Sequence, residues 1–200
     1  MERGSWNDIL DLAKRQGAVT PSDVRAMGLA PENLNKLAKL GLLVRSGRGV
    51  YVHPEFDWTE YHTYVEVAKA VPSAVFCLLT ALRIHDLGTQ SPHQVWIAVP
   101  RDQRPPRSRT NLRTVRMSPR QYALGIEARD VEGVQIKVYS VEKTLVDCFR
   151  LRRLVGHDVA VEALKDALRK RLLDIDVFVE TAKGLRADKL VMPYLEALTQ

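Results

Sequence analysis

Residues 34–53, LNKLAKLGLLVRSGRGVYVH, decide the fold of the N-terminal part of the chain. Leu34, Leu37 and Leu40 recur every three residues, which predicts a helix with one apolar face. Gly41 follows, at the position where helices commonly end in the left-handed conformation. The stretch therefore predicts a short amphipathic helix that ends at a glycine.

Two β-prone segments follow that glycine. Residues 42–45 and 50–52 are rich in leucine, valine and tyrosine, and the polar residues 46–49 between them include two glycines. Arg45 ends the first segment and Arg48 lies in the turn. A helix, a glycine stop and a small hairpin with a basic tip follow one another in this order in a winged helix-turn-helix. In that fold the helix enters the major groove of DNA, and the hairpin, called the wing, contacts phosphates or the minor groove.

Two more helices are predicted before this stretch. We expect the first to begin at Ser5, which would be its N-cap. Thr20 and Pro21 indicate the start of the second helix, as cap and first helical residue, and Gly28 ends it. Pro31 then opens the third helix after a turn of a few residues, as a helix-turn-helix requires.

The polar side of the third helix carries the candidate base readers. Asn33 and Lys36 are the first choices because side chains near the start of a recognition helix reach the base edges, and Asn35 ranks behind them. The wing arginines would contact the DNA backbone or the minor groove. The predicted DNA-binding residues of this region are Asn33, Asn35, Lys36, Lys39, Arg45 and Arg48.

The excess positive charge of the chain lies in one segment. The 200 residues include 30 basic and 24 acidic ones, for a formal charge of +6. Residues 101–120 contain seven arginines and a single acidic residue, so they account for this excess: Arg101, Arg104, Arg107, Arg109, Arg113, Arg116 and Arg120, against Asp102. Guanidinium groups match phosphate oxygens in geometry, so we expect Arg101, Arg104, Arg107, Arg109 and Arg113 to contact DNA. The alternative is a solvated loop that only keeps the protein soluble.

The rest of the sequence predicts a second, larger domain. Residues 57–88 are expected to be helical, residues 94–139 to form strands, and residues 140–200 to be helical again. We therefore predict an α+β fold class. A winged helix-turn-helix domain of residues 1–54 precedes an α+β domain of residues 55–200, which has a small antiparallel sheet and a helical C-terminus.

Signatures of several other classes are missing. The two cysteines lie inside apolar runs and indicate buried thiols, and the five histidines lack metal-ligand spacing. The usual nucleotide-binding and acyl-transfer motifs do not occur. No apolar run reaches the length of a membrane span, and the N-terminus lacks the apolar core of a signal peptide. We therefore expect a cytoplasmic protein that is not an enzyme and holds no metal or cofactor.

Short motifs follow one another in a specific order over residues 5–150. They are Gln16–Thr20, Gly28-Leu29, Leu34–Gly41, Arg48–Tyr51, Leu79–Leu87, Val95–Arg101 and Tyr139–Asp147. In this order they resemble the AbiEi family of antitoxins and transcriptional repressors, found in bacterial toxin–antitoxin loci. Two positions depart from the family pattern. Asp86 stands where glycine is common, so we expect a different turn there, and Lys143 stands where arginine is common, which keeps the charge but loses the fork.

The resemblance implies a DNA-binding repressor of its own operon that is also an antitoxin. Its partners would be double-stranded operator DNA and a nucleotidyltransferase-like toxin. One alternative is a protein-interaction module whose C-terminal helices bind the toxin directly, with DNA binding secondary. Another is a nuclease, for which Asp130 and Glu132, near a predicted hairpin, are the candidate acidic residues.

Overall fold

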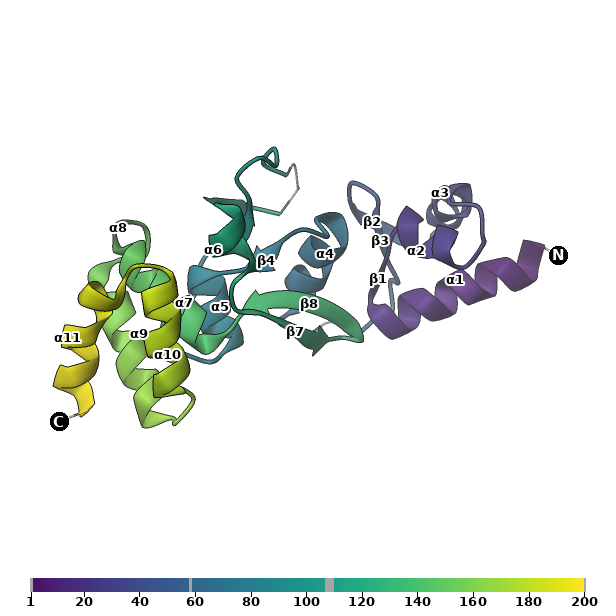
Figure 1. Ribbon diagram of the computed structural model, residues 1–200. Coiled ribbons are helices and arrows are strands. Elements are labelled where there is room, and N and C mark those ends of the chain that lie inside the picture. Colours follow the sequence, from purple (N-terminus) through teal and green to yellow (C-terminus); the bar gives the residue numbers. More distant parts are fainter. Residues whose placement is uncertain (1, 58, 107–109, 200) are drawn as a thin grey trace. The chain divides into compact units, whose positions relative to one another are not determined.

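The computed structural model describes residues 2–57, 59–106 and 110–199. The chain forms two compact units, each with its own hydrophobic core. One unit comprises residues 1–74, 106–111 and 128–136, and the other comprises residues 75–105, 112–127 and 137–200. Figure 1 shows the order of the helices and strands along the chain.

The first unit contains the winged helix. Its elements are α1 Glu2–Gln16, β1 Ala18–Val19, α2 Pro21–Ala26, α3 Glu32–Lys39, β2 Val44–Gly47, β3 Val50–Val52 and α4 His62–Ala70. The three strands form an antiparallel sheet in the order β1-β3-β2. Tyr51 of β3 lies opposite Val19 of β1 on one side and Arg45 of β2 on the other. The α+β fold class with an N-terminal winged helix is therefore confirmed.

Local signals account for the start of α2 and the end of α3. Thr20 and Asp23 form a capping box, in which the side chain of each residue bonds to the backbone N–H of the other. At the end of α3, the Leu42 N–H donates to the Leu37 carbonyl over 3.0 Å and the Gly41 N–H to the Ala38 carbonyl over 3.1 Å. These two bonds are the Schellman motif, and they stop the helix at Gly41, whose φ is +74°.

Two sequence-based expectations for the first unit differ from the structure. The N-cap predicted at Ser5 is wrong, because α1 begins at Glu2 and runs through Ser5. Serine is tolerated inside a helix at a small cost, so a possible cap residue in the sequence does not by itself fix where the helix begins. Strand β1 is absent from the sequence-based expectation, since two residues are too few to show an alternating pattern.

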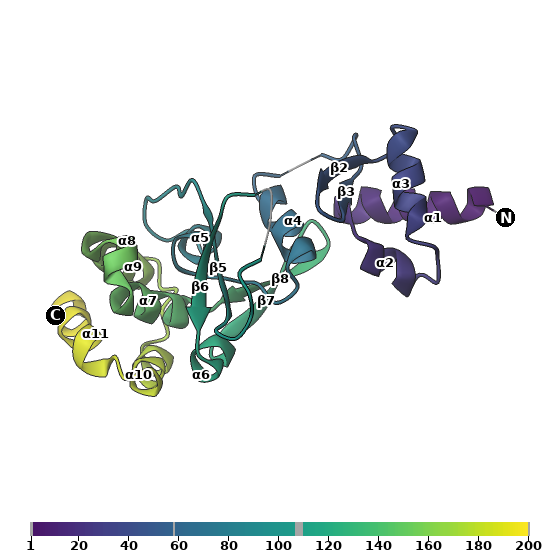
Figure 2. The same cartoon turned by 90° about the horizontal axis from the view of Figure 1, so that it is seen from above.

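The second unit contains a larger sheet and most of the helices. Its elements are β4 Val75–Phe76, α5 Leu78–Ile84, β5 Val95–Pro100, β6 Leu112–Met117, α6 Pro119–Ala123, β7 Ile126–Val131, β8 Val134–Tyr139, α7 Val141–Arg150, α8 Arg152–Val155, α9 His157–Arg169, α10 Ile175–Gly184 and α11 Asp188–Thr199; the tip of the β7–β8 hairpin belongs to the first unit. The sheet has five strands in the order β6-β5-β4-β8-β7. Helices α7 to α11 gather on one side of it (Figures 1 and 2).

The expectation that residues 57–88 are helical holds for α4 and α5 but misses the strand between them. Strand β4 lies between α4 and α5, and it pairs with both β5 and β8. Val75 and Phe76 lie inside a run of buried residues, where periodicity does not distinguish a strand from a helix. The pattern of apolar residues therefore does not reveal the central strand of the sheet.

The sheet is mixed, so its expected antiparallel pairing is corrected. Strands β5 and β6 run parallel, in register from Val95 opposite Leu112 to Pro100 opposite Met117. Strands β4 and β8 are also parallel. Parallel neighbours need a crossover connection, because β5 ends at Pro100 whereas β6 begins at Leu112, opposite Val95 at the start of β5. The arginine-rich segment is therefore this crossover together with β6 and the start of α6.

Helix α7 is the centre of the second unit. Ser140 caps it by accepting the Lys143 N–H over 3.2 Å, and α5, α8, α9, α10 and α11 all contact it. Lys143 is fully buried and pairs with Asp147, which also accepts from Arg150 over 2.6 Å. The Lys143 ammonium lies 4.1 Å from the centroid of the Tyr139 ring. Burial lowers the pKa of Lys143, and the nearby Asp147 carboxylate opposes that shift.

Aspartate at position 86, where the family commonly has glycine, led us to expect a different turn after α5, but the turn has the geometry that a glycine would adopt. The Leu87 N–H donates to the Leu82 carbonyl over 2.8 Å and the Asp86 N–H to the Arg83 carbonyl over 3.1 Å, the same Schellman pattern as at Gly41. Asp86 takes a φ of +56° to allow this. That conformation costs a non-glycine residue roughly 1 kcal/mol.

Two glycines with positive φ provide a matched test of the fold. Alanine at Gly41 meets nothing within 4 Å, so the substitution should cost only the backbone strain, about 1 kcal/mol of unfolding free energy. A Cβ at Gly125 would lie 2.7 Å from the Cβ of Lys143, so Gly125→Ala should cost about 3 kcal/mol. Chemical denaturation of both variants measures this difference, and equal losses would contradict the packing described here.

Candidate nucleic-acid interface

The outward side of α3 is polar and exposed. Leu34 and Leu37 are fully buried in the core of the first unit, which leaves the opposite side of the helix toward solvent. The exposed residues there recur at spacings of three and four, as one helical stripe: Glu32, Asn35, Lys36 and Lys39. The major groove of B-DNA is wide enough to admit an α-helix.

The two favoured asparagines differ in exposure. Asn33 is half-buried, at the border of the packed side, whereas Asn35 is exposed within the stripe. The hydroxyl group of Tyr51 donates a hydrogen bond to the Asn35 Oδ1 atom over 2.7 Å. Sequence reasoning ranks Asn35 lower and misses Tyr51, because nothing in the sequence indicates a bond between residues sixteen positions apart.

The wing is a tight hairpin with both of its arginines exposed. Strands β2 and β3 pair with a bulge between Arg45 and Gly47, and residues 48–49 form the turn. The Arg45 Nε donates to the Gly47 carbonyl over 3.3 Å, so its guanidinium stays near the base of the turn. Gly49 has a φ of +73°, a conformation that the turn needs and that glycine adopts without strain.

Helix α4 packs against the small sheet and is bonded to the wing and to the helix-turn-helix. It contacts all three strands of the small sheet. The Ser46 hydroxyl of the wing donates to the Glu66 carboxylate, and Lys69 bonds to Asp23 over 3.0 Å and to Gln16 over 2.9 Å. These contacts fix the wing and α2 to one common helix.

The carboxylates considered for a nuclease are already engaged. Glu132, with a side chain 3% exposed, accepts from the Thr59 N–H over 2.9 Å and lies 2.7 Å from the His62 Nδ1. Asp130 accepts from the Gly133 N–H and from the Gln135 amide. Over the part of the chain that the structure describes, no group of three histidine, cysteine, aspartate or glutamate residues could hold a metal ion. Glu132 is arranged as a structural carboxylate that ties the hairpin tip to the segment before α4.

The arginine-rich segment presents its charges to solvent wherever it is described. Arg101, Arg104, Arg113, Arg116 and Arg120 are exposed, and Arg107 and Arg109 lie outside the described residues. The Arg113 guanidinium lies 5.5 Å from the Trp96 ring centroid. Arg116 donates to the Arg101 carbonyl. These contacts hold two of the guanidinium groups near β5 without covering them.

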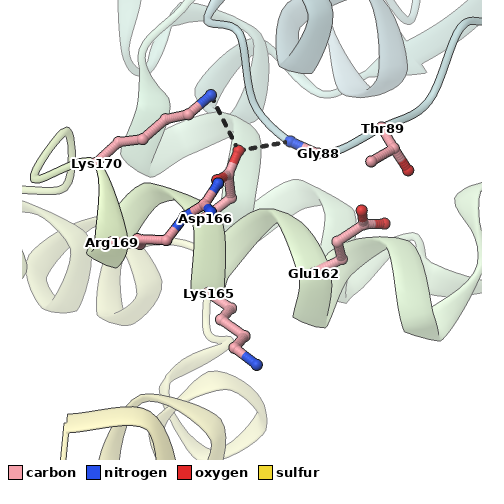
Figure 3. Close-up of a pocket in the computed structure, with 7 residues that line it drawn as sticks. All are labelled: Gly88, Thr89, Glu162, Lys165, Asp166, Arg169 and Lys170. Carbon is pink, nitrogen blue, oxygen red and sulfur yellow. Dashed lines mark hydrogen bonds and ion pairs between the residues drawn. The ribbon is translucent and has the colours of Figure 1, made fainter.

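A further polar pocket lies beside α9 (Figure 3), with a volume of about 300 Å³. Asp166 accepts there from the Gly88 N–H over 3.1 Å and pairs with Lys170 over 3.2 Å and with Arg169. Burial raises the pKa of Asp166, but the hydrogen bonds from these three groups outweigh burial and lower it. This network ties the turn after α5 to α9, so we assign it a structural role.

The geometry defines a class of protein. A helix-turn-helix, a three-stranded sheet and a basic wing together form a winged helix, a fold of DNA-binding regulators. Residues 7–54 match the model of a family described as transcriptional regulators, AbiEi antitoxin. The match over this region confirms the resemblance seen in the sequence.

Comparison with solved structures supports the fold over most of the chain. The crystal structure of the protein RV2827C from Mycobacterium tuberculosis is similar, with a TM-score of 0.59 and 16% sequence identity. The match covers 90% of this chain and 71% of that one. A comparison with curated proteins gave no significant match. Among the helices of the described residues, none is long and apolar enough to cross a membrane.

The structural role of Glu132 leads to a prediction. Glu132→Ala would remove the buried carboxylate that serves Thr59 and His62, and should cost about 3 kcal/mol of unfolding free energy. Asp130→Ala is the matched control: it removes a carboxylate from the same hairpin, but from an exposed position, and should cost less than about 1 kcal/mol. Thermal and chemical unfolding compare the two. A larger loss for Asp130→Ala would refute the assignment.

Proposed function

We propose that this protein is a DNA-binding repressor of its own operon and an antitoxin. The single observation that carries the proposal is that one domain presents both an exposed polar stripe on α3 and an exposed wing with two arginines. This domain matches the model of the AbiEi antitoxin family of transcriptional regulators. In such a domain α3 enters the major groove, and Asn35, Lys36 and Lys39 meet base edges or phosphates. The wing then lies along the backbone.

The arginine-rich segment would extend the interface to more phosphates. Non-specific affinity for DNA comes mostly from counterion release and scales with the number of phosphates neutralised. The net excess of six positive charges lies in residues 101–120, and the segment's described arginines are exposed. We propose that this segment supplies much of the salt-dependent affinity, while α3 supplies sequence preference.

A second candidate function is toxin binding through the C-terminal helices. Leu172, Ile175 and Val177, at and just before the start of α10, are 44–45% exposed. Exposed apolar side chains grouped along a short segment are typical of protein-binding surfaces. Binding of a nucleotidyltransferase-like toxin by the DNA-free protein would favour direct neutralisation over regulation of expression alone.

The wing contribution can be measured from salt dependence. Arg45→Ala/Arg48→Ala should weaken binding to all duplexes by a similar factor, because phosphates carry no sequence information. The slope of log affinity against log salt should fall by about 0.9 for each phosphate that the wing no longer neutralises, hence by about 1.8. Arg153→Ala/Lys165→Ala, which removes the same charge from exposed sites on α8 and α9, is the control and should leave the slope near that of the wild type. An unchanged slope in the wing variant would exclude the wing from the interface.

The arginine-rich segment is tested separately. Changing Arg101, Arg104, Arg107 and Arg109 to glutamine keeps the polarity and removes four charges from the crossover between β5 and β6. The salt slope should fall by about 0.9 for each arginine that neutralises a phosphate. The melting temperature should not change, because the described members, Arg101 and Arg104, are exposed. Wild-type affinity and slope in this variant would show that the segment faces solvent or a protein instead.

A further inference from the structure

Tyr51 is held rigidly beneath the recognition helix. It occupies the middle strand of the small sheet, paired on both sides, and it is only 4% exposed. Its hydroxyl is the donor in the 2.7 Å bond to the Asn35 Oδ1. A buried tyrosine hydroxyl needs a partner, and here that partner is a side chain of the exposed stripe.

This bond fixes the orientation of the Asn35 amide. An asparagine amide carries an oxygen acceptor and an NH₂ donor on one planar group. Because the oxygen is turned to the Tyr51 hydroxyl, the NH₂ group of the same plane is turned away from it. Asn35 is exposed, so what it offers to a ligand is a pair of N–H donors.

A donor-only amide distinguishes the purines. Asparagine normally reads adenine with both of its groups, accepting from N6 and donating to N7. Guanine presents two acceptors at the same edge, O6 and N7. An amide whose oxygen is turned to Tyr51 presents its N–H donors to the groove, and these match the guanine acceptors but oppose the adenine N6 donor.

We propose that Tyr51 is a specificity-determining residue, which turns Asn35 into a reader of guanine in the major groove. This inference rests on the proposed DNA-binding function and adds the base that one position of the site must contain. Lys36 and Lys39, on the same stripe, are donors as well, so the stripe suits an acceptor-rich groove edge. Tyr51 does not touch DNA and acts only by positioning Asn35.

The test uses the full-length protein and a pool of random double-stranded DNA sequences. The wild type should select a preferred site, and the Asn35→Ala variant should lose the preference at one base pair of that site. At this pair the wild type should prefer G·C over A·T by about tenfold. Tyr51→Phe keeps the buried ring and removes the hydroxyl, so the freed amide should shift that same pair toward A·T by a similar factor. Asn7→Ala, which removes an exposed asparagine side chain from α1, is the control and should leave this pair unchanged.

The outcomes separate this inference from the proposed function. A wild-type preference for A·T at the Asn35-dependent pair would overturn it, and so would an unchanged preference in Tyr51→Phe or in Asn35→Ala. Binding of all duplexes without preference would also overturn the guanine reading, but it would leave the proposed DNA-binding function intact. Failure of the wild type to bind any duplex at low salt would instead overturn the proposed function. Asn35→Ala changes an exposed side chain, so it tests the reading even if Tyr51→Phe loses stability.

Discussion

Strand β3 is the element on which the first unit depends. It pairs with β1 on one side and β2 on the other, and Val50, Tyr51 and Val52 are all buried. Through these pairs it places the wing, and through the Tyr51 hydroxyl it reaches Asn35 on α3. The two elements proposed to touch DNA are thus positioned by three residues. Because α4 also contacts all three strands, the wing is supported on a packed helix rather than on a loop.

Local features of the fold could be predicted from the sequence. The Thr20 cap, the Gly41 stop and the hairpin around Arg48 depend on a few neighbouring residues, and each lies where the sequence placed it. Strands β1 and β4 have two residues each, and their existence depends on partners far along the chain. The parallel pairing of β5 and β6 likewise follows from the return of a long crossover, which periodicity does not show.

In the candidate site, too, the sequence predicts local features but not contacts between distant residues. The basic wing and the polar stripe follow from residue types and helical spacing, so the sequence predicts them. Which asparagine is exposed, and which of its atoms is engaged, depends on packing against β3 and could not be predicted. Glu132 is a similar case: a carboxylate that looks available in the sequence is buried and paired in the fold. Buried charges of this kind specify packing and cost stability when one partner is removed.

Hydrogen exchange of the full-length protein, with and without a random-sequence duplex at low salt, tests the central claim most directly. If α3 and the wing form the DNA interface, amides of residues 32–39 and 44–50 will exchange more slowly with DNA present, while those of α10 and α11 will not change. Protection confined to α10 and α11, with none in α3 or the wing, would contradict the account.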